Sequence, residues 1–215
     1  IDWILSKNNI SMWRQDLDAF EAALYSTSNA VAQEADPFDG MALDMHWLDP
    51  KSSIGAWVHK WAPRATRNRH GGIGDMKIHN AWAVARHGDE KSLFACQDAV
   101  ASARSRHWAE ERALHQPDVY PHVSKDRKDA YEKSHTAVLF HGTRSVNVSG
   151  ILRKALLMPK QLVGVVITGA MFGPGLYFAD DWKKSAGYTS LSGGYYSSGG
   201  GSVRGRHAFM FMADV

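Results

Sequence analysis

The residues with the greatest chemical potential lie between positions 141 and 188 of the chain. Residues 136–141 are apolar and rich in β-forming types, which predicts a buried strand that delivers His141 and Gly142 to the rim of a cleft. Because Gly142 has no Cβ, a flat ligand can reach both its N–H and its C=O. A primary carboxamide offers one donor edge and one acceptor to such a backbone. We therefore interpret this stretch as a nicotinamide-binding pocket.

The chain that follows supplies candidate walls for that ligand. Residues 175–180 alternate like a half-buried strand, and Asp180 or Asp181 can cap a helix that we predict over residues 182–188. The glycines around this point precede a strand, whereas a phosphate-binding loop needs a strand, then the loop, then a helix. They suit a lid whose backbone passes close over a ligand.

Two tyrosines are candidates for enclosing a flat ring. Tyr177 lies on the predicted strand and Tyr188 on the predicted helix. Ser185 and Tyr188 are three residues apart and so share a helix face, while Lys184 flanks Tyr188 from four residues away. We expect a ring to lie between Tyr177 and Tyr188, with Ser185 hydrogen-bonding its amide.

These motifs carry a family resemblance. Residues 141–147, 169–180 and 184–188 resemble the catalytic domain of poly(ADP-ribose) polymerases, in the family order and at the family spacing. A weaker similarity runs back to about Met41, notably over residues 77–90. The resemblance implies an NAD-binding fold of the diphtheria-toxin type and ADP-ribosyl transfer, with NAD+ as the co-substrate and no metal.

The resemblance also implies a role for each site residue. His141 and Tyr177 would be catalytic residues, and His141 would hold the adenosine ribose. Gly142 and Ser185 would hold the nicotinamide amide, with Tyr177 and Tyr188 on the two faces of the ring. The predicted NAD+-contacting set is His141, Gly142, Thr143, Arg144, Asn147, Gly169, Tyr177, Phe178, Lys184, Ser185 and Tyr188.

Two features depart from the family pattern. The family usually places a glutamate on a later strand, where it grips the nicotinamide ribose and helps to polarise the acceptor, but no glutamate follows Glu132 here. Residues 209–215 read as a strand without its continuation, so we expect the final strands beyond Val215 or on a second polypeptide. Ala170 and Pro174 stand where many relatives carry an aromatic residue and a lysine, which argues against chain elongation.

Two functions of different classes fit this pattern. The first is an NAD-dependent ADP-ribosyltransferase that modifies a protein or nucleic-acid acceptor. The second is a catalytically incomplete module that binds NAD+, ADP-ribose or a protein partner. The intact nicotinamide side of the pocket favours the first.

The implied architecture is an α+β ADP-ribosyltransferase fold, with two packed, mainly antiparallel β-sheets and flanking helices. We predict a helical segment over residues 1–38, read by analogy as the end of a regulatory helical domain, and the catalytic domain over residues 39–215. Within these, the predicted helices cover residues 1–35, 54–61 and 93–114, further strands cover 41–47 and 76–86, and loops cover 63–70, 87–90, 116–133 and 190–205.

Composition sets loose limits on function. The chain has 215 residues, 44% of them apolar, and a net charge of +3, which is too small to argue for nucleic-acid binding. The single cysteine, Cys96, excludes an internal disulfide and reads as a buried, inert thiol. The histidines show no metal-binding spacing. Without a membrane-spanning window or signal peptide, we expect an intracellular protein, cytoplasmic or nuclear.

Overall fold

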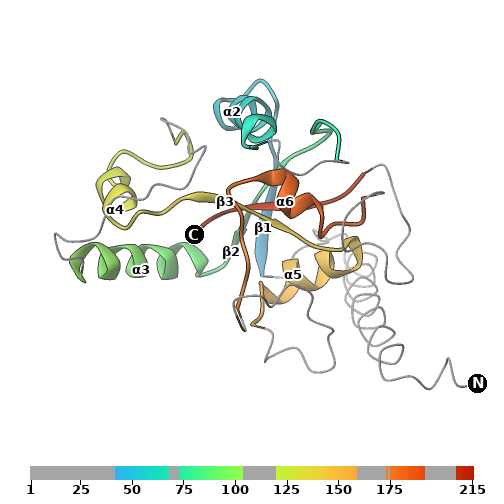
Figure 1. Cartoon of the computed structure of the whole chain (residues 1–215). Coiled ribbons are helices and arrows are strands. Elements are labelled where there is room, and N and C mark those ends of the chain that lie inside the picture. The colour runs from blue at the N-terminus through green and yellow to red at the C-terminus, as the bar shows by residue number, and fades with distance from the viewer. Residues whose placement is uncertain (1–41, 68–72, 104–119, 159–172, 174, 192–206) are drawn as a thin grey trace, which may run out of the picture. The chain divides into compact units, whose positions relative to one another are not determined.

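The described part of the chain contains five helices longer than one turn and four strands. The computed structural model describes residues 42–67, 73–103, 120–158, 173, 175–191 and 207–215 (Figure 1). By its internal contacts the chain forms two compact units, one of residues 1–43, 142–178 and 186–210, the other of residues 44–141, 179–185 and 211–215. The helix predicted over residues 1–35 lies outside the described residues, and the boundary predicted at residue 38 stays a prediction.

Strands β1 (Leu43–Trp47) and β2 (Trp82–Arg86) form a two-stranded sheet (Figure 1). The N–H of Leu48 donates to the carbonyl of Ala81 over 2.9 Å, where one strand ends and the other begins, so the pair is antiparallel. The strand predicted at residues 41–47 is confirmed. The strand predicted at residues 76–86 was too long, because the five residues of β1 give a partner only to residues 82–86.

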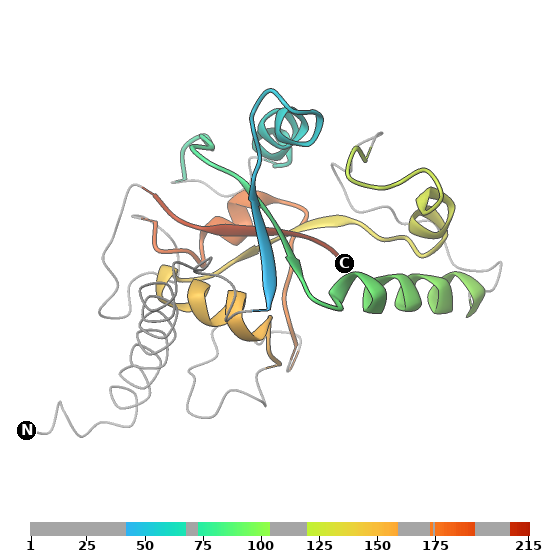
Figure 2. The same ribbon diagram turned by 180° about the vertical axis from the view of Figure 1, so that it is seen from behind.

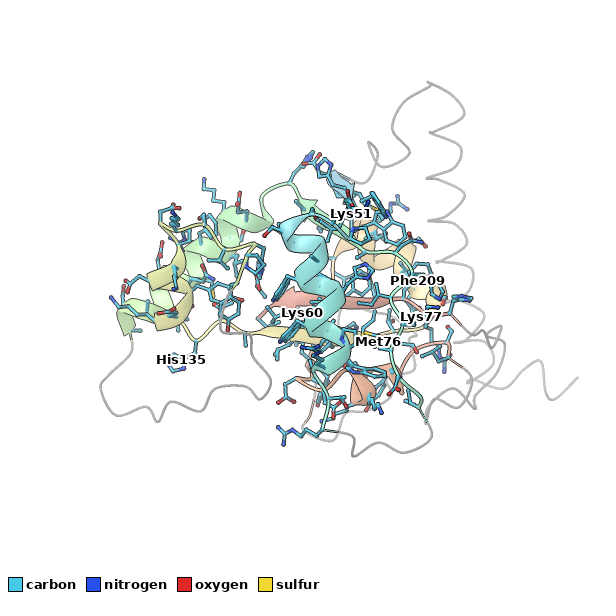
Figure 3. All side chains as sticks on the ribbon, turned by 90° about the horizontal axis from the view of Figure 1, so that it is seen from above. Lys51, Lys60, Met76, Lys77, His135 and Phe209 are labelled. Atoms are coloured by element: carbon cyan, nitrogen blue, oxygen red, sulfur yellow. The ribbon has the colours of Figure 1, made fainter. Side chains whose placement is uncertain are left out.

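Helix α2 (Ser53–Trp61) confirms the helix predicted over residues 54–61 and continues into the 3-10 turn η2 (Ala62–Arg64). The Ser52 hydroxyl caps α2, accepting from the Gly55 N–H at 3.1 Å and donating to the carbonyl of Asp49 at 2.7 Å. Trp57 and Trp61, one turn apart, stack with ring centroids 5.4 Å apart. Figure 3 looks down on α2, with Lys51 just before its start and Lys60 near its end.

Helix α3 (Asp89–Ala103) starts four residues before the predicted start, and its predicted end lies outside the described residues. Asp89 and Glu90 were read as a turn, but their negative charges favour the first turn of a helix. The prediction of a buried Cys96 was wrong, because α3 buries the next residue, Gln97, and leaves the thiol exposed. The Gln97 amide donates to the Thr136 hydroxyl at 3.0 Å.

Helix α4 (Lys128–Lys133) ends the stretch that was predicted as a loop with one helical turn. Arg127, just before it, joins this stretch to α3. Its guanidinium lies 4.3 Å from the ring centroid of Phe94 and donates to the Gln97 side-chain carbonyl at 3.1 Å. These contacts give the short helix a tertiary anchor that six residues cannot supply alone.

Strands β3 (Val138–Gly142) and β4 (Met210–Asp214) form the second two-stranded sheet and confirm the strands predicted at residues 136–141 and 209–215 (Figure 2). Ala137 and Val215 exchange two hydrogen bonds of 3.0 Å, which makes the pair antiparallel. Phe140 is 1% exposed, and its ring stacks on Trp61 with centroids 5.6 Å apart. This stack joins α2 to β3.

The end of β4 is held by a half-buried polar cluster. The Tyr131 hydroxyl donates to Oδ1 of Asp214 at 2.7 Å, and the same oxygen lies 3.1 Å from Nε2 of His122. Tyr131 is buried. Burial, together with the charge of Asp214, raises the pKa of Tyr131 far above its ordinary value.

In the other unit, the 3-10 turn η3 (Ser145–Asn147) leads into α5 (Val148–Lys154). The described elements therefore make an α+β structure with small antiparallel sheets, and the packing of two larger sheets stays a prediction. Among the described residues, no helix is both long and apolar enough to cross a membrane.

We expect Gly55→Ala to destabilise the protein. An added Cβ would lie 2.0 Å from the carbonyl oxygen of Asp49, a clash that outweighs the better helix propensity of alanine, which is worth about 1 kcal/mol. Gly150→Ala is the matched control, because a Cβ there meets nothing within 4 Å and should stabilise α5. Thermal unfolding of both variants checks the prediction, and a gain in stability from Gly55→Ala would contradict it.

We expect Tyr131 to make the protein sensitive to alkali. Because its pKa is raised in the folded state, its contribution is fully present below the ordinary tyrosine pKa and is lost as the pH rises above it. The loss at pH 11, one unit above that ordinary pKa of about 10, is about 1.4 kcal/mol. Urea unfolding from pH 8 to 11 should show a shallower alkaline decline for Tyr131→Phe, and equal slopes would refute this account.

Candidate active site

The β3–β4 register determines how Gly142 presents its backbone. Since Ala137 and Val215 form a hydrogen-bonded pair, alternation makes His141–Phe211 a bonded pair and Gly142–Met210 a non-bonded pair. The N–H and C=O of Gly142 therefore point away from β4. This orientation is what the predicted amide-binding role of Gly142 requires.

The His141 side chain follows from the same alternation. Phe140 points towards α2, where it stacks on Trp61, so its neighbour His141 lies on the opposite face of β3. His141 is half-buried. Its imidazole is thus kept apart from the aromatic stack that joins α2 to β3.

The other edge of β3 meets residues 179–185. Phe140 and Ala179 form an antiparallel bridge through hydrogen bonds of 2.8 and 2.9 Å. The strand predicted over residues 175–180 was wrong in extent, because this range forms a single-residue bridge at Ala179 and no strand. The Ser185 hydroxyl also donates to the carbonyl of Phe140 at 2.9 Å. Ser185 therefore lies at β3, beside the residue that precedes His141.

Helix α6 (Trp182–Ala186) carries Ser185. As predicted for one of the two aspartates, Asp181 caps it, because Oδ1 accepts from the N–H of Lys183 at 2.9 Å. The helix ends two residues before Tyr188, so the prediction that Ser185 and Tyr188 share a helix face was wrong. Gly187 follows the helix, and the N–H and hydroxyl of Thr189 both donate to the carbonyl of Ala186, which closes it with a turn.

Arg144 and Asn147, which the resemblance would place near the adenosine end of NAD+, lie with Thr143 where β3 leads into η3. The side-chain amide of Asn147 donates to the Thr143 hydroxyl at 3.1 Å, and its N–H donates to the carbonyl of Arg144 at 3.0 Å. The Ser190 hydroxyl accepts from the N–H of Ser145 at 2.9 Å. This small network fixes the local backbone between Thr143 and Asn147.

The remaining predicted residues of the described chain lie between residues 177 and 188. The Tyr177 hydroxyl donates to the carbonyl of Gly173, which ties the ring to its own loop. Phe178 and Tyr188 are half-buried, and Lys184 is exposed. Gly169 lies outside the described residues. The facing of Tyr177 and Tyr188 across a ligand stays a prediction.

Three partners of the site were not found from the sequence. These are the Phe140 carbonyl that binds Ser185, the Asp181 carboxylate that accepts from the N–H of Arg67 at 3.1 Å, and the Ser190 hydroxyl that binds Ser145, and each joins distant parts of the chain. Only Asp181 left a local signal, as a capping residue before a helix. Within the described residues, no three His, Cys, Asp or Glu side chains gather in a group that could hold a metal ion.

Comparison with known proteins assigns the class. The model of the poly(ADP-ribose) polymerase catalytic domain matches residues 65–215. The chain therefore belongs to the poly(ADP-ribose) polymerase catalytic-domain family, which confirms the resemblance. Membership implies the ADP-ribosyltransferase fold, with which the α+β elements agree.

Individual relatives match over shorter stretches. Poly [ADP-ribose] polymerase 2 of Arabidopsis thaliana is 41% identical over 68 residues, which cover 31% of this chain and 10% of that protein. Poly [ADP-ribose] polymerase 1 of Gallus gallus is 45% identical over 56 residues, covering 26% and 5%. The poly [ADP-ribose] polymerase of Sarcophaga peregrina is 41% identical over 68 residues, covering 31% and 6%. The chain thus matches a tenth or less of the length of these relatives.

Proposed function

We propose that the protein is an NAD-dependent ADP-ribosyltransferase, which cleaves the bond between nicotinamide and ribose and transfers ADP-ribose to a protein or nucleic-acid acceptor. The observation that carries the proposal is the family match, because residues 65–215 include every residue of the predicted NAD+ set. The orientation of the Gly142 peptide and the place of Ser185 at β3 support it.

In this proposal the amide is held by complementary polar atoms. The Gly142 N–H donates to the amide oxygen, and the Gly142 carbonyl accepts one amide N–H. The Ser185 hydroxyl proton is committed to the Phe140 carbonyl, so its oxygen is available to accept the second amide N–H. The site would then favour a primary amide over a carboxylate, which has no N–H to donate.

The remaining residues would orient the substrate for bond cleavage. Tyr177 and Tyr188 hold the faces of the nicotinamide ring, and His141 holds the adenosine ribose, so that the reacting ribose stays near its productive geometry. The bond from the ribose carbon to nicotinamide breaks, nicotinamide leaves with the electron pair, and an acceptor oxygen or nitrogen bonds to that carbon and loses its proton. The positive charge that develops on the ribose needs a nearby carboxylate.

That carboxylate distinguishes the two candidate functions. The family glutamate has no counterpart after Glu132 in this sequence. In a transferase, a further part of the protein or a second polypeptide would supply it. The alternative, a binding module for NAD+ or ADP-ribose, would need only the residues of the nicotinamide side.

The transferase proposal is tested by incubating the full-length protein with NAD+ labelled on the adenosine half. We expect label on a macromolecule, and His141→Ala or Tyr188→Ala should lower the labelling rate at least about tenfold, the effect of losing one well-placed contact. His87→Ala is the matched control, because this exposed histidine is outside the predicted NAD+ set and its imidazole lies 3.7 Å from the Asp44 carboxylate. Labelling that survives both site substitutions would overturn the proposal.

Binding measurements separate the alternative. A protein that binds nicotinamide and ADP-ribose but labels no acceptor is the binding module, whereas a protein that binds neither is excluded from both functions. Nicotinic acid should bind at least about tenfold more weakly than nicotinamide, since its carboxylate would face the Gly142 carbonyl and the Ser185 oxygen. Equal affinities for the two would refute the proposed amide contacts.

A further inference from the structure

Asp181 makes a long-range contact that helix capping does not require. Its Oδ1 accepts the N–H of Lys183 at 2.9 Å within α6, but its Oδ2 accepts the N–H of Arg67 at 3.1 Å, 114 residues away in the chain. The residue is 4% exposed. A buried carboxylate that spans two backbone donors of different segments fixes those segments to each other, because leaving either oxygen without a donor is costly.

Trp182 strengthens the same junction. Its N–H donates to the carbonyl of Ala65 at 3.1 Å, and its indole N–H donates to the carbonyl of Pro63 at 3.1 Å. Trp182 and Ala65 are both buried. The start of α6 is therefore bound at four points, counting the cap, and three of these lead to residues 63–67.

The length of α6 makes this junction important. The helix has five residues, too few to be stable without tertiary contacts. Ser185, one turn from Asp181, is held at the far end by its bond to the Phe140 carbonyl. The place of the Ser185 oxygen thus depends on the anchor at the start of the helix.

We propose that Asp181 is a positioning residue for the nicotinamide amide: by binding the N–H groups of Arg67 and Lys183 together, it fixes the Ser185 oxygen at the edge of β3. The inference rests on the proposed function, in which Ser185 accepts an amide N–H. Asp181 itself touches no substrate. Its neighbour Asp180 pairs instead with the guanidinium of Arg67 at 3.0 Å and has no part in this role.

The test is a double-mutant cycle in the full-length protein. Asp181→Ser keeps a hydroxyl that can cap α6 but is too short to reach Arg67 as well. Ser185→Ala removes the amide contact, and the two changes are also combined. Asp180→Asn is the matched control, because it removes the ion pair with Arg67 and leaves the buried junction intact. Nicotinamide and ADP-ribose dissociation constants are measured by calorimetry, with thermal unfolding as the check of folding.

We expect Asp181→Ser to weaken nicotinamide binding about fivefold to tenfold, near the effect of losing one hydrogen bond, and to leave ADP-ribose binding unchanged. In the Ser185→Ala background the same change should add less than about twofold, because the contact that it positions is already absent. Asp180→Asn should change neither constant. Asp181→Asn keeps one of the two acceptor oxygens, so it should weaken nicotinamide binding less than Asp181→Ser does.

Each other result has a distinct meaning. Equal losses of nicotinamide and ADP-ribose affinity, or losses that add fully in the double variant, would show a role in overall stability and overturn the positioning role. Unchanged nicotinamide binding in Asp181→Ser would also overturn the positioning role, but it would leave the proposed function in place. If the unaltered protein binds no nicotinamide, the proposed function fails and the positioning role fails with it.

Discussion

The register between β3 and β4 is the constraint on which the candidate site depends. Side chains and backbone groups alternate along a strand, so a shift of one residue would turn the N–H and C=O of Gly142 into the β4 ladder and move His141 to the other face. Two interactions hold the observed register at its outer end: the paired hydrogen bonds between Ala137 and Val215, and the bonds of Asp214 to Tyr131 and His122. The backbone orientation of Gly142 is thus fixed by contacts at the opposite end of β3.

The second edge of β3 carries the complementary half of the arrangement. The Phe140 carbonyl accepts from both Ala179 and Ser185, so both of its lone pairs are used. The Phe140 ring packs on Trp61, which stacks on Trp57. A continuous aromatic stack therefore fixes the peptide to which Ser185 binds. In a low-dielectric environment these two hydrogen bonds hold Ala179 and Ser185 firmly at the Phe140 carbonyl, because breaking either bond would leave a buried polar group unpaired.

Elements with a strong local signal could be predicted from the sequence, and elements that depend on partners could not. The apolar run before His141 and the helical spacing of Trp57 and Trp61 fix β3 and α2 without knowledge of the rest. Residues 76–81 and 175–178 show a similar alternation, yet they are not strands, because pairing needs a neighbouring strand of matching length. The error at Cys96 is of the same kind, since burial on α3 is decided by what covers each face, and that face is centred on Gln97.

The candidate site shows the same division at the level of atoms. Motif spacing selected Ser185 as a ligand for the amide, but whether its hydroxyl donates or accepts depends on its protein partner, which is 45 residues away in the chain. Because the Phe140 carbonyl has no proton, only the Ser185 hydroxyl can donate in that bond, and the serine oxygen is left as an acceptor. A hydroxyl that could rotate freely would serve an amide and a carboxylate alike. The part of the amide selectivity that comes from Ser185 would therefore depend on the main-chain carbonyl of Phe140, which a side-chain motif cannot reveal.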